Sequence, residues 1–335
     1  MHSDTRYTLL LLFASLAKTG IYPRGPEYWL AKAVNPWGAL MQGSNSWLFH
    51  WIYHALGATS RAGWPIVSAM MLLAAMIALL VSVMRIPEGH QRRSFAASIF
   101  ASGVPAVLAF SYAFYDALFL VGLMMMVVGR DRVTLLVCGA FVMAGANPEQ
   151  AVIAGIACTL VGVSLRDGAQ ITRAGIAATI VASLQLIVLI LLRGGSLGDR
   201  AGVFFTNLPA AVTGHLAGNS IELFSWYGTA WIILISCTSG LASGFRRLFL
   251  WSGLLVLPAL VTLTTLDGTR VFVLTSGLAF VYFAAYAAEH GALDIQIRRV
   301  QLATLLALLN PCLYYAGWTH SLWLPNQALL GVPAM

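Results

Sequence analysis

The stretch WPIVSAMMLLAAMIALLVSVM, residues 64–84, has no charged side chain and is followed at once by Arg85. A helix of about 20 apolar residues is long enough to cross the hydrocarbon core of a bilayer. This stretch therefore predicts a membrane-spanning α-helix, and comparable apolar runs recur on both sides of it. We expect eleven spans, at residues 7–23, 64–84, 94–111, 115–129, 133–146, 149–165, 174–193, 228–243, 248–266, 271–288 and 301–316.

Composition indicates the same class of protein along the whole chain. Of the 335 residues, 59% are hydrophobic and only 9% are charged, too few charges for the surface of a soluble domain. In lipid the backbone groups must be hydrogen-bonded within the chain, so helices are the expected spanning elements. We therefore predict an all-α, polytopic bundle that forms a single transmembrane domain over residues 1–335.

Basic residues fall mainly in alternate gaps between the spans. Twelve of the 19 Lys and Arg residues lie in these gaps or in the N-terminal tail. An excess of Lys and Arg in short loops marks the cytoplasmic side, so we expect the N-terminus to lie inside. The compact loops, with no room for a soluble domain, lead us to expect a bacterial inner (plasma) membrane. Anionic lipid then accounts for the net charge of +7, and nucleic acid is not an expected partner. The marked gaps contain Arg85, Arg92 and Arg93, Arg130 and Arg132, Arg166 and Arg173, Arg246 and Arg247, and Arg298 and Arg299.

The first apolar run has two interpretations. Residues 7–17 lie between Arg6 and Lys18, as the apolar core of a signal sequence would, but the small residues around them form only a weak cleavage site. We expect a span that is retained.

The longest outer gap, residues 24–63, carries tryptophans at helical spacing. Residues 26–42 predict a helix that Pro36 bends, and residues 46–57 predict a second helix with its large apolar side chains on one side. Amphipathic helices with tryptophan anchors lie in the headgroup layer of a membrane. We expect two such interfacial helices here.

Two acidic residues in the outer gaps are candidates for chemistry. Glu27 follows the first span in RGPEYW, where a carboxylate is either a general base or a solvated interfacial side chain. Asp116 follows Tyr115 in SYAFYDALFL, where it is either part of a site or the N-cap of the next helix.

The sharpest local cluster is formed by Asp267 and Arg270 in TLTTLDGTRVFVL. Arg270 is an isolated arginine in an outer turn and therefore needs an anion: Asp267, a phosphate, or both. The planar guanidinium suits phosphate recognition. The alternative is a local Asp–Arg pair that caps the following helix.

Asn147 and Glu149 flank Pro148, the arrangement that ordinarily starts a helix. The same polar cluster also suits a ligand at the mouth of a bundle. His50 and His54 are spaced i, i+4, which permits joint metal ligation, but no third ligand accompanies them. We expect no resident metal, although a divalent cation (Mg²⁺ or Mn²⁺) between carboxylate and phosphate is compatible with the sequence.

The longer outer loop, residues 194–227, supplies the remaining candidates. His215 and Glu222 have side chains that act as acid or base, or lie solvated in a loop. Arg193 and Arg200 flank a glycine-rich turn and suit a pyrophosphate.

This order of features resembles the membrane-embedded glycosyltransferases of the GT-C superfamily. Their shared module has seven spans, a long first external loop with a catalytic acid, and two juxtamembrane helices, which matches residues 1–230; residues 231–335 would be additional C-terminal spans. The resemblance implies that a sugar or glycan is transferred from a polyprenyl-(pyro)phosphate carrier, such as an undecaprenyl-linked donor, to an envelope glycan on the periplasmic face. Glu27 would occupy the catalytic-acid position and, as a general base, would contribute about 10²–10⁴-fold.

The resemblance also implies roles for the other candidates. Asp116 and Asp267 join Glu27 as catalytic residues, and Arg270, Arg200 and Arg193 bind the carrier phosphate. Glycan binding then falls to Glu149, Asn147, Tyr115, Trp226, Glu222 and His215.

Two alternatives stay open. The O-antigen and capsule polymerases of the Wzy type also act on the outer face of the membrane and rely on external arginines. A transporter or flippase for a lipid-linked glycan would carry polar residues near the midplane and two related halves, whereas the span interiors here are nearly free of charge.

Overall fold

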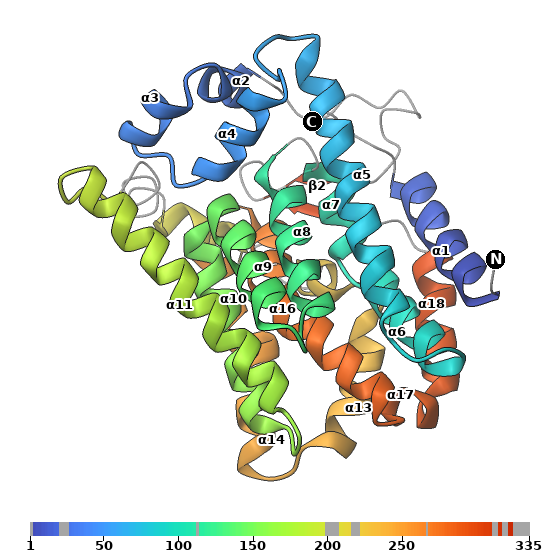
Figure 1. Ribbon diagram of the computed structural model, residues 1–335. Helices are drawn as coiled ribbons and strands as arrows, with labels where there is room; N and C mark the ends of the chain where they lie inside the picture. Colours follow the sequence, from blue (N-terminus) through green and yellow to red (C-terminus); the bar gives the residue numbers. More distant parts are fainter. Residues whose placement is uncertain are drawn as a thin grey trace.

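The computed structural model describes residues 3–19, 27–111, 114–197, 208–215, 222–265, 267–309, 314–316 and 321–323. These residues are mostly helical, with one short antiparallel pair of strands (Figure 1). The first half of the chain forms α1 (Ser3–Thr19), α2 (Glu27–Val34), α3 (Pro36–Met41), α4 (Trp47–Ala55), α5 (Gly63–Met84), α6 (His90–Ala101), α7 (Val104–Ser111), α8 (Tyr115–Val128), α9 (Val133–Ala146) and α10 (Pro148–Ser164). The second half forms α11 (Ala169–Leu192), α13 (Ala230–Leu241), α14 (Phe245–Trp251), the π-helix η1 (Ser252–Val256), α15 (Leu257–Leu263), α16 (Gly268–Glu289), α17 (Ala292–Ile295), α18 (Ile297–Leu309), β1 (Tyr314–Ala316) and β2 (Ser321–Trp323).

Among the described residues, four helical stretches are long and apolar enough to cross a membrane. They are α5, α11, the continuous run Phe245–Leu263, and α16. Four shorter helices, α8, α9, α10 and α13, are also apolar. The protein is therefore a helical membrane protein, as its composition predicts.

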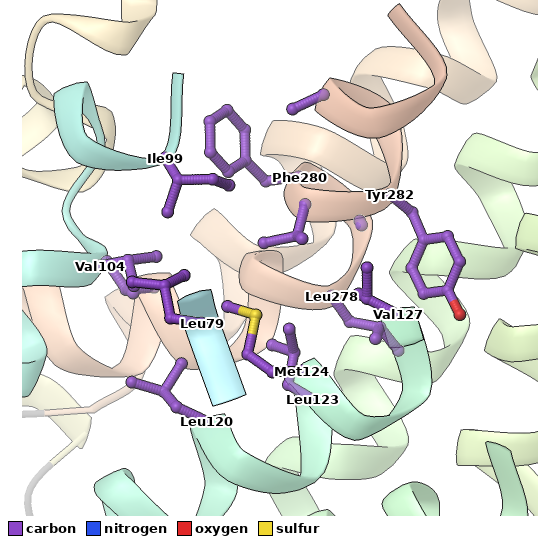
Figure 2. Packing of buried hydrophobic residues seen from close by; sticks show 14 of the residues in the cluster. Leu79, Ile99, Val104, Leu120, Leu123, Met124, Val127, Leu278, Phe280 and Tyr282 are labelled. Carbon is purple, nitrogen blue, oxygen red and sulfur yellow. The ribbon is translucent and has the colours of Figure 1, made fainter. Parts of the chain in front are cut away.

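Helix α16 lies in the middle of the bundle. Its most apolar stretch is buried at every residue, whereas only 39% of the corresponding stretch of α5 and 22% of that of α11 are buried. It packs against α10, α15, α6 and α8, and Figure 2 shows Leu123 and Met124 of α8 beside Leu278 of α16. The Tyr282 hydroxyl also donates to the Met126 carbonyl at 2.8 Å. The candidate residues at the N-terminal end of α16 therefore stand on a helix that its neighbours hold on all sides.

Glycines let neighbouring helices approach closely. A Cβ added at Gly155 of α10 would lie 2.4 Å from Thr179 Oγ1 of α11, and one added at Gly175 of α11 would lie 2.4 Å from Thr159 of α10. Small residues at helix contacts are typical of membrane bundles, where close backbone packing replaces the hydrophobic effect as the driving force.

The expected span at 94–111 is wrong as a single helix. It is divided into α6 and α7 at Ser102 and Gly103. A Cβ at Gly103 would lie 2.6 Å from a Val273 methyl group and 2.8 Å from the Trp226 carbonyl, so the break itself packs against α16 and the segment before α13.

The expected span at 301–316 is also wrong at its C-terminal end. Helix α18 ends at Leu309, and residues 314–316 instead pair with residues 321–323, with Tyr314 opposite Trp323.

The sequence predicts one helix over residues 26–42 that bends at Pro36, whereas the structure has two helices there, α2 and α3. Asn35 separates α2 from α3 and its side chain accepts the N–H of Gly38 at 2.9 Å, while Pro36 takes the first position of α3. Helices α2, α3 and α4 form a layer at one end of the bundle (Figure 1), and Trp37 and Trp51 are exposed on it.

Ion pairs fasten the opposite end. Arg93 Nε lies 2.7 Å from an Asp4 carboxylate oxygen, and Arg130 Nη2 lies 2.5 Å from a Glu289 oxygen. The second pair joins the C-terminal ends of α8 and α16. The gaps that contain Arg93 and Arg130 thus lie at the end away from α2–α4.

The π-helix η1 has a local chemical cause. Pro258 supplies no N–H to the carbonyls one turn before it, so that stretch is short of a donor. The buried Tyr227 hydroxyl donates to the Leu254 carbonyl at 2.5 Å. The Tyr227 side chain, from another segment, therefore supplies the hydrogen-bond donor that Pro258 cannot give to the Leu254 carbonyl.

Candidate functional site

The site is centred on Arg270, in the first turn of α16. Its Nε lies 2.9 and 3.0 Å from the two carboxylate oxygens of Asp116, and its Nη1 lies 3.0 Å from Asp267 Oδ2. The side chain of Asp116 is fully covered, that of Arg270 is 13% exposed and that of Asp267 is 21% exposed. Two carboxylates therefore bind one guanidinium, and Asp267 is the more accessible of the two.

Local sequence explains why these side chains point at one another. Phe114, not Asp116, takes the N-cap position of α8, so the expected capping role of Asp116 is wrong. Asp267 does take the N-cap position of α16, but its side chain makes no capping hydrogen bond and pairs with Arg270 at i+3 instead. Both acids lie at helix N-termini, where the partial positive charge of the backbone favours a carboxylate.

Aromatic rings flank the guanidinium. Arg270 Cζ lies 4.7 Å from the centroid of Tyr115 and 5.1 Å from that of Phe114. Trp29 of α2 meets both rings edge-on, at 5.7 and 5.6 Å, and stacks on His50 of α4 at 5.7 Å. The outer helices thus reach Arg270 through aromatic contacts. Tyr115 was expected from the sequence to stack on a sugar; here it stands against the arginine.

A second polar cluster borders the same turn. His215 Nδ1 lies 2.7 Å from Glu222 Oε2, and His215 Nε2 lies 2.5 Å from the Thr265 carbonyl, two residues before Asp267. Ser225 Oγ lies 2.6 Å from Thr269 Oγ1, on the other side of Asp267. His215 and Glu222 are 2% exposed, so they are not solvated loop residues.

Burial lowers the pKa of His215, but the hydrogen bonds that its ring donates to Glu222 and to the Thr265 carbonyl, together with the negative charge of Glu222, outweigh that effect. The net result is a raised pKa. A buried pair of this kind stabilises the protonated imidazole.

Arg193 anchors the outer helices. Its guanidinium donates to the Leu40 carbonyl at 2.7 Å, to the Ser44 carbonyl at 2.6 Å and to the Asn45 side chain. The Asn45 amide in turn donates to Glu149. The expected phosphate ligand Arg193 and the expected glycan ligand Glu149 therefore meet in one network that fixes the turn between α3 and α4.

Several candidates stand apart from Arg270. Asn147 is the N-cap of α10 and accepts the N–H of Gln150 at 3.2 Å, which confirms the helix-start interpretation. Trp226 stacks on Phe272 of α16 at 4.3 Å. Helix α2 begins at Glu27, but the Glu27 side chain and the whole of Arg200 lie outside the described residues.

The two outer histidines have separate partners. His50 Nε2 lies 2.7 Å from Ser44 Oγ, and His54 Nδ1 lies 2.9 Å from the Ala33 carbonyl. Within the part of the chain that the structure describes, no three His, Cys, Asp or Glu side chains come together as metal ligands. Asp116 and Asp267 both bind the Arg270 guanidinium and do not converge on a common point where a cation would lie. These residues therefore do not fit a divalent cation.

Sequence reasoning missed the roles of Trp29, Ser44 and Asn45. The signal was present in GSNS, residues 43–46, a polar run between two amphipathic helices whose Ser44, Asn45 and Ser46 are all buried. Buried polar residues in a short connection ordinarily bind a neighbouring element.

Comparison with protein-family models, with curated proteins and with solved structures gives no match. A guanidinium held at a bundle end by two acids, with aromatic rings on its flank, is suited to receive an oxyanion by exchange with the accessible Asp267.

Proposed function

We propose that this protein is a membrane glycosyltransferase that transfers a sugar or glycan from a polyprenyl-(pyro)phosphate carrier to an envelope glycan. The observation that carries the proposal is the fixed position of Arg270 between Asp116 and Asp267 at the bundle end that α2–α4 cover. The proposal includes eleven spans, a cytoplasmic N-terminus and a periplasmic active face in the inner membrane.

In the proposed reaction the acceptor hydroxyl oxygen attacks the anomeric carbon of the donor. The bond from that carbon to the carrier phosphate oxygen breaks, and the phosphate leaves with the bonding electrons. Arg270 stabilises the negative charge that develops on the leaving group. Asp116 acts as a positioning residue, because both of its oxygens face Arg270 Nε.

The acceptor proton passes to a carboxylate. Asp267 is one candidate, since its side chain is the more exposed of the two acids. Glu27 is the other, since it begins the helix whose Trp29 contacts Tyr115. No step is assigned to a metal ion, since the described acids bind the arginine instead.

The test compares matched arginine variants in a deletion strain. Arg270→Lys keeps the charge but loses the planar fork, and we expect transfer to fall about 10²-fold, as for the loss of one oxyanion donor. Arg130→Lys is the matched control, because Arg130 pairs with Glu289 at the other end of the same two helices. Gel and mass profiles of surface glycans give the readout.

The outcomes separate the alternatives. Loss of one defined sugar supports a transferase of the GT-C kind. Loss of long chains with single repeats retained identifies a polymerase instead. An unchanged profile in the deletion strain, or full activity in each of Glu27→Gln, Asp116→Asn and Arg270→Lys, rejects the proposed function or its site.

A further inference from the structure

The turn that carries Asp267 is held from both sides by one segment of the chain. His215 binds the Thr265 carbonyl before Asp267, and Ser225 meets Thr269 after it. Glu222, between these two, binds the His215 ring, and its carbonyl accepts the Ser225 hydroxyl at 2.7 Å. We refer to His215, Glu222 and Ser225 as the clamp.

The protonation state of His215 follows from what its two nitrogens face. Nδ1 lies within 2.6–2.7 Å of both Glu222 oxygens, and Nε2 lies 2.5 Å from a backbone carbonyl. A carbonyl only accepts, and an ionised carboxylate only accepts. A neutral imidazole has one N–H and satisfies one of these partners, whereas the imidazolium donates to both.

Burial increases the energetic cost of leaving either His215 or Glu222 charged without the other. Both side chains are 2% exposed, so a single charge there would be costly, and each charge requires the other. The clamp therefore keeps both of its His215 contacts only while the His215–Glu222 pair retains this proton. The charged groups on the turn that the clamp holds are Asp267 and Arg270, which pair with each other, and Arg270 also pairs with Asp116.

We infer that His215 is a buried imidazolium that, with Glu222 and Ser225, positions the Asp267 turn and so sets the direction of the Arg270 guanidinium. His215 is a positioning residue in this inference and does not touch the substrate. The functional part of the inference rests on the proposed glycosyl transfer; the protonation state does not.

The first test is spectroscopic and needs no substrate. The detergent-solubilised full chain is labelled with ¹⁵N-histidine, and the seven histidines are resolved by comparison with His215→Gln. We expect both ring nitrogens of His215 to carry protons at neutral pH and the proton to be lost at a pH above that of an ordinary histidine. A ring that is neutral at neutral pH, with the proton on Glu222, overturns the inference.

The second test measures hydrogen exchange of the backbone at residues 264–270. We expect exchange there to speed up when the pH rises through the His215 transition, after correction for intrinsic exchange. His215→Gln and Glu222→Gln should show fast exchange at every pH. His290→Gln is the matched control, since His290 binds the Tyr286 carbonyl at the opposite end of α16. Exchange that is equal in wild type and His215→Gln overturns the positioning role.

The third test measures how the clamp affects the rate of glycosyl transfer. We expect kcat for transfer to fall about 10²-fold in His215→Gln, as for a small misplacement of a catalytic group, and the alkaline limb of the pH profile to disappear. If wild type transfers no glycan while the first two tests succeed, the proposed function fails and the clamp stands. If wild type is active and His215→Gln keeps both its kcat and its pH profile, the functional part of the inference fails.

Discussion

Arg270 Nε binds both carboxylate oxygens of Asp116, at 2.9 and 3.0 Å, across 154 residues of sequence. The pair joins the N-terminal ends of α8 and α16, and Arg130 with Glu289 joins their C-terminal ends. The two helices therefore run parallel, and one ion pair fixes each end.

Removing one member of the buried pair should destabilise the protein more than removing both. In Asp116→Ala the Arg270 guanidinium loses one of its two carboxylate partners, and we expect the free energy of unfolding to fall by about 3–5 kcal/mol. The double variant Asp116→Leu with Arg270→Met replaces the pair by apolar groups and should cost far less. Unfolding in mixed detergent measures the difference, and a double variant as unstable as the sum of the single variants would contradict this account.

Tyr227→Phe should destabilise the run Phe245–Leu263. The change leaves the Leu254 carbonyl without the hydroxyl that binds it at 2.5 Å, and a buried unsatisfied carbonyl costs about 1–3 kcal/mol. Pro258→Ala restores a backbone N–H to this stretch, so the loss from Tyr227→Phe should be smaller in that background. An equal loss in both backgrounds would show that the hydroxyl does not compensate for the proline.

Gly155→Ala should separate α10 from α11. The new methyl group would lie 2.4 Å from Thr179 Oγ1 and 2.6 Å from the Thr179 nitrogen, where backbone must move. Overpacking of this kind costs about 1–3 kcal/mol. Gly240→Ala in α13 is the control, because nothing lies within 4 Å of its added Cβ. Thermal unfolding of the two variants should differ in midpoint, with Gly240→Ala close to wild type.

Asp4→Asn should loosen α1. The N–H of Gly89 donates to Asp4 at 2.8 Å and lowers the pKa of that carboxyl; burial opposes this and Arg93 reinforces it, so the net pKa is lowered. A carboxyl group whose pKa is lower in the folded state stabilises that state at pH values above its ordinary pKa. This stabilisation is lost as the pH falls through the pKa of the folded state. Protection of residues 3–19 from hydrogen exchange should therefore be constant near neutral pH in wild type and reduced in Asp4→Asn.

Asp131→Asn serves as the control for this change, since Asp131 lies at the same end but is 67% exposed. Equal protection of α1 in wild type and Asp4→Asn would show that apolar contacts alone hold the helix.

Much of the secondary structure could be predicted because its causes are local. Residues 64–84 and 133–146 are helical almost to the predicted boundary, since a long apolar run in lipid has few other ways to satisfy its backbone. Asn147 and Pro148 start α10, and Pro36 divides the outer segment, because caps and prolines act on the turn in which they stand.

The candidate site could be predicted only in part. Asp267 and Arg270 are three residues apart, so their pairing was visible as one of two interpretations. The division at Ser102 was missed although Gly103 and Pro105 are local helix-breaking residues, whereas its packing against Val273 and Trp226 depends on residues far along the chain. The role of Arg193 depends on Ser44 and Asn45 in the same way.

Sequence alone determined that this is a membrane protein of apolar helices and that its arginine-rich gaps alternate along the chain. Hydrophobic length and charge are properties of each segment by itself. Only the tertiary structure decided which polar side chains meet: Asp116 with Arg270, Glu222 with His215, and Glu149 with Asn45 beside Arg193. The choice among many possible partners depends on how the helices pack around α16, and packing is a property of the whole bundle rather than of any one span.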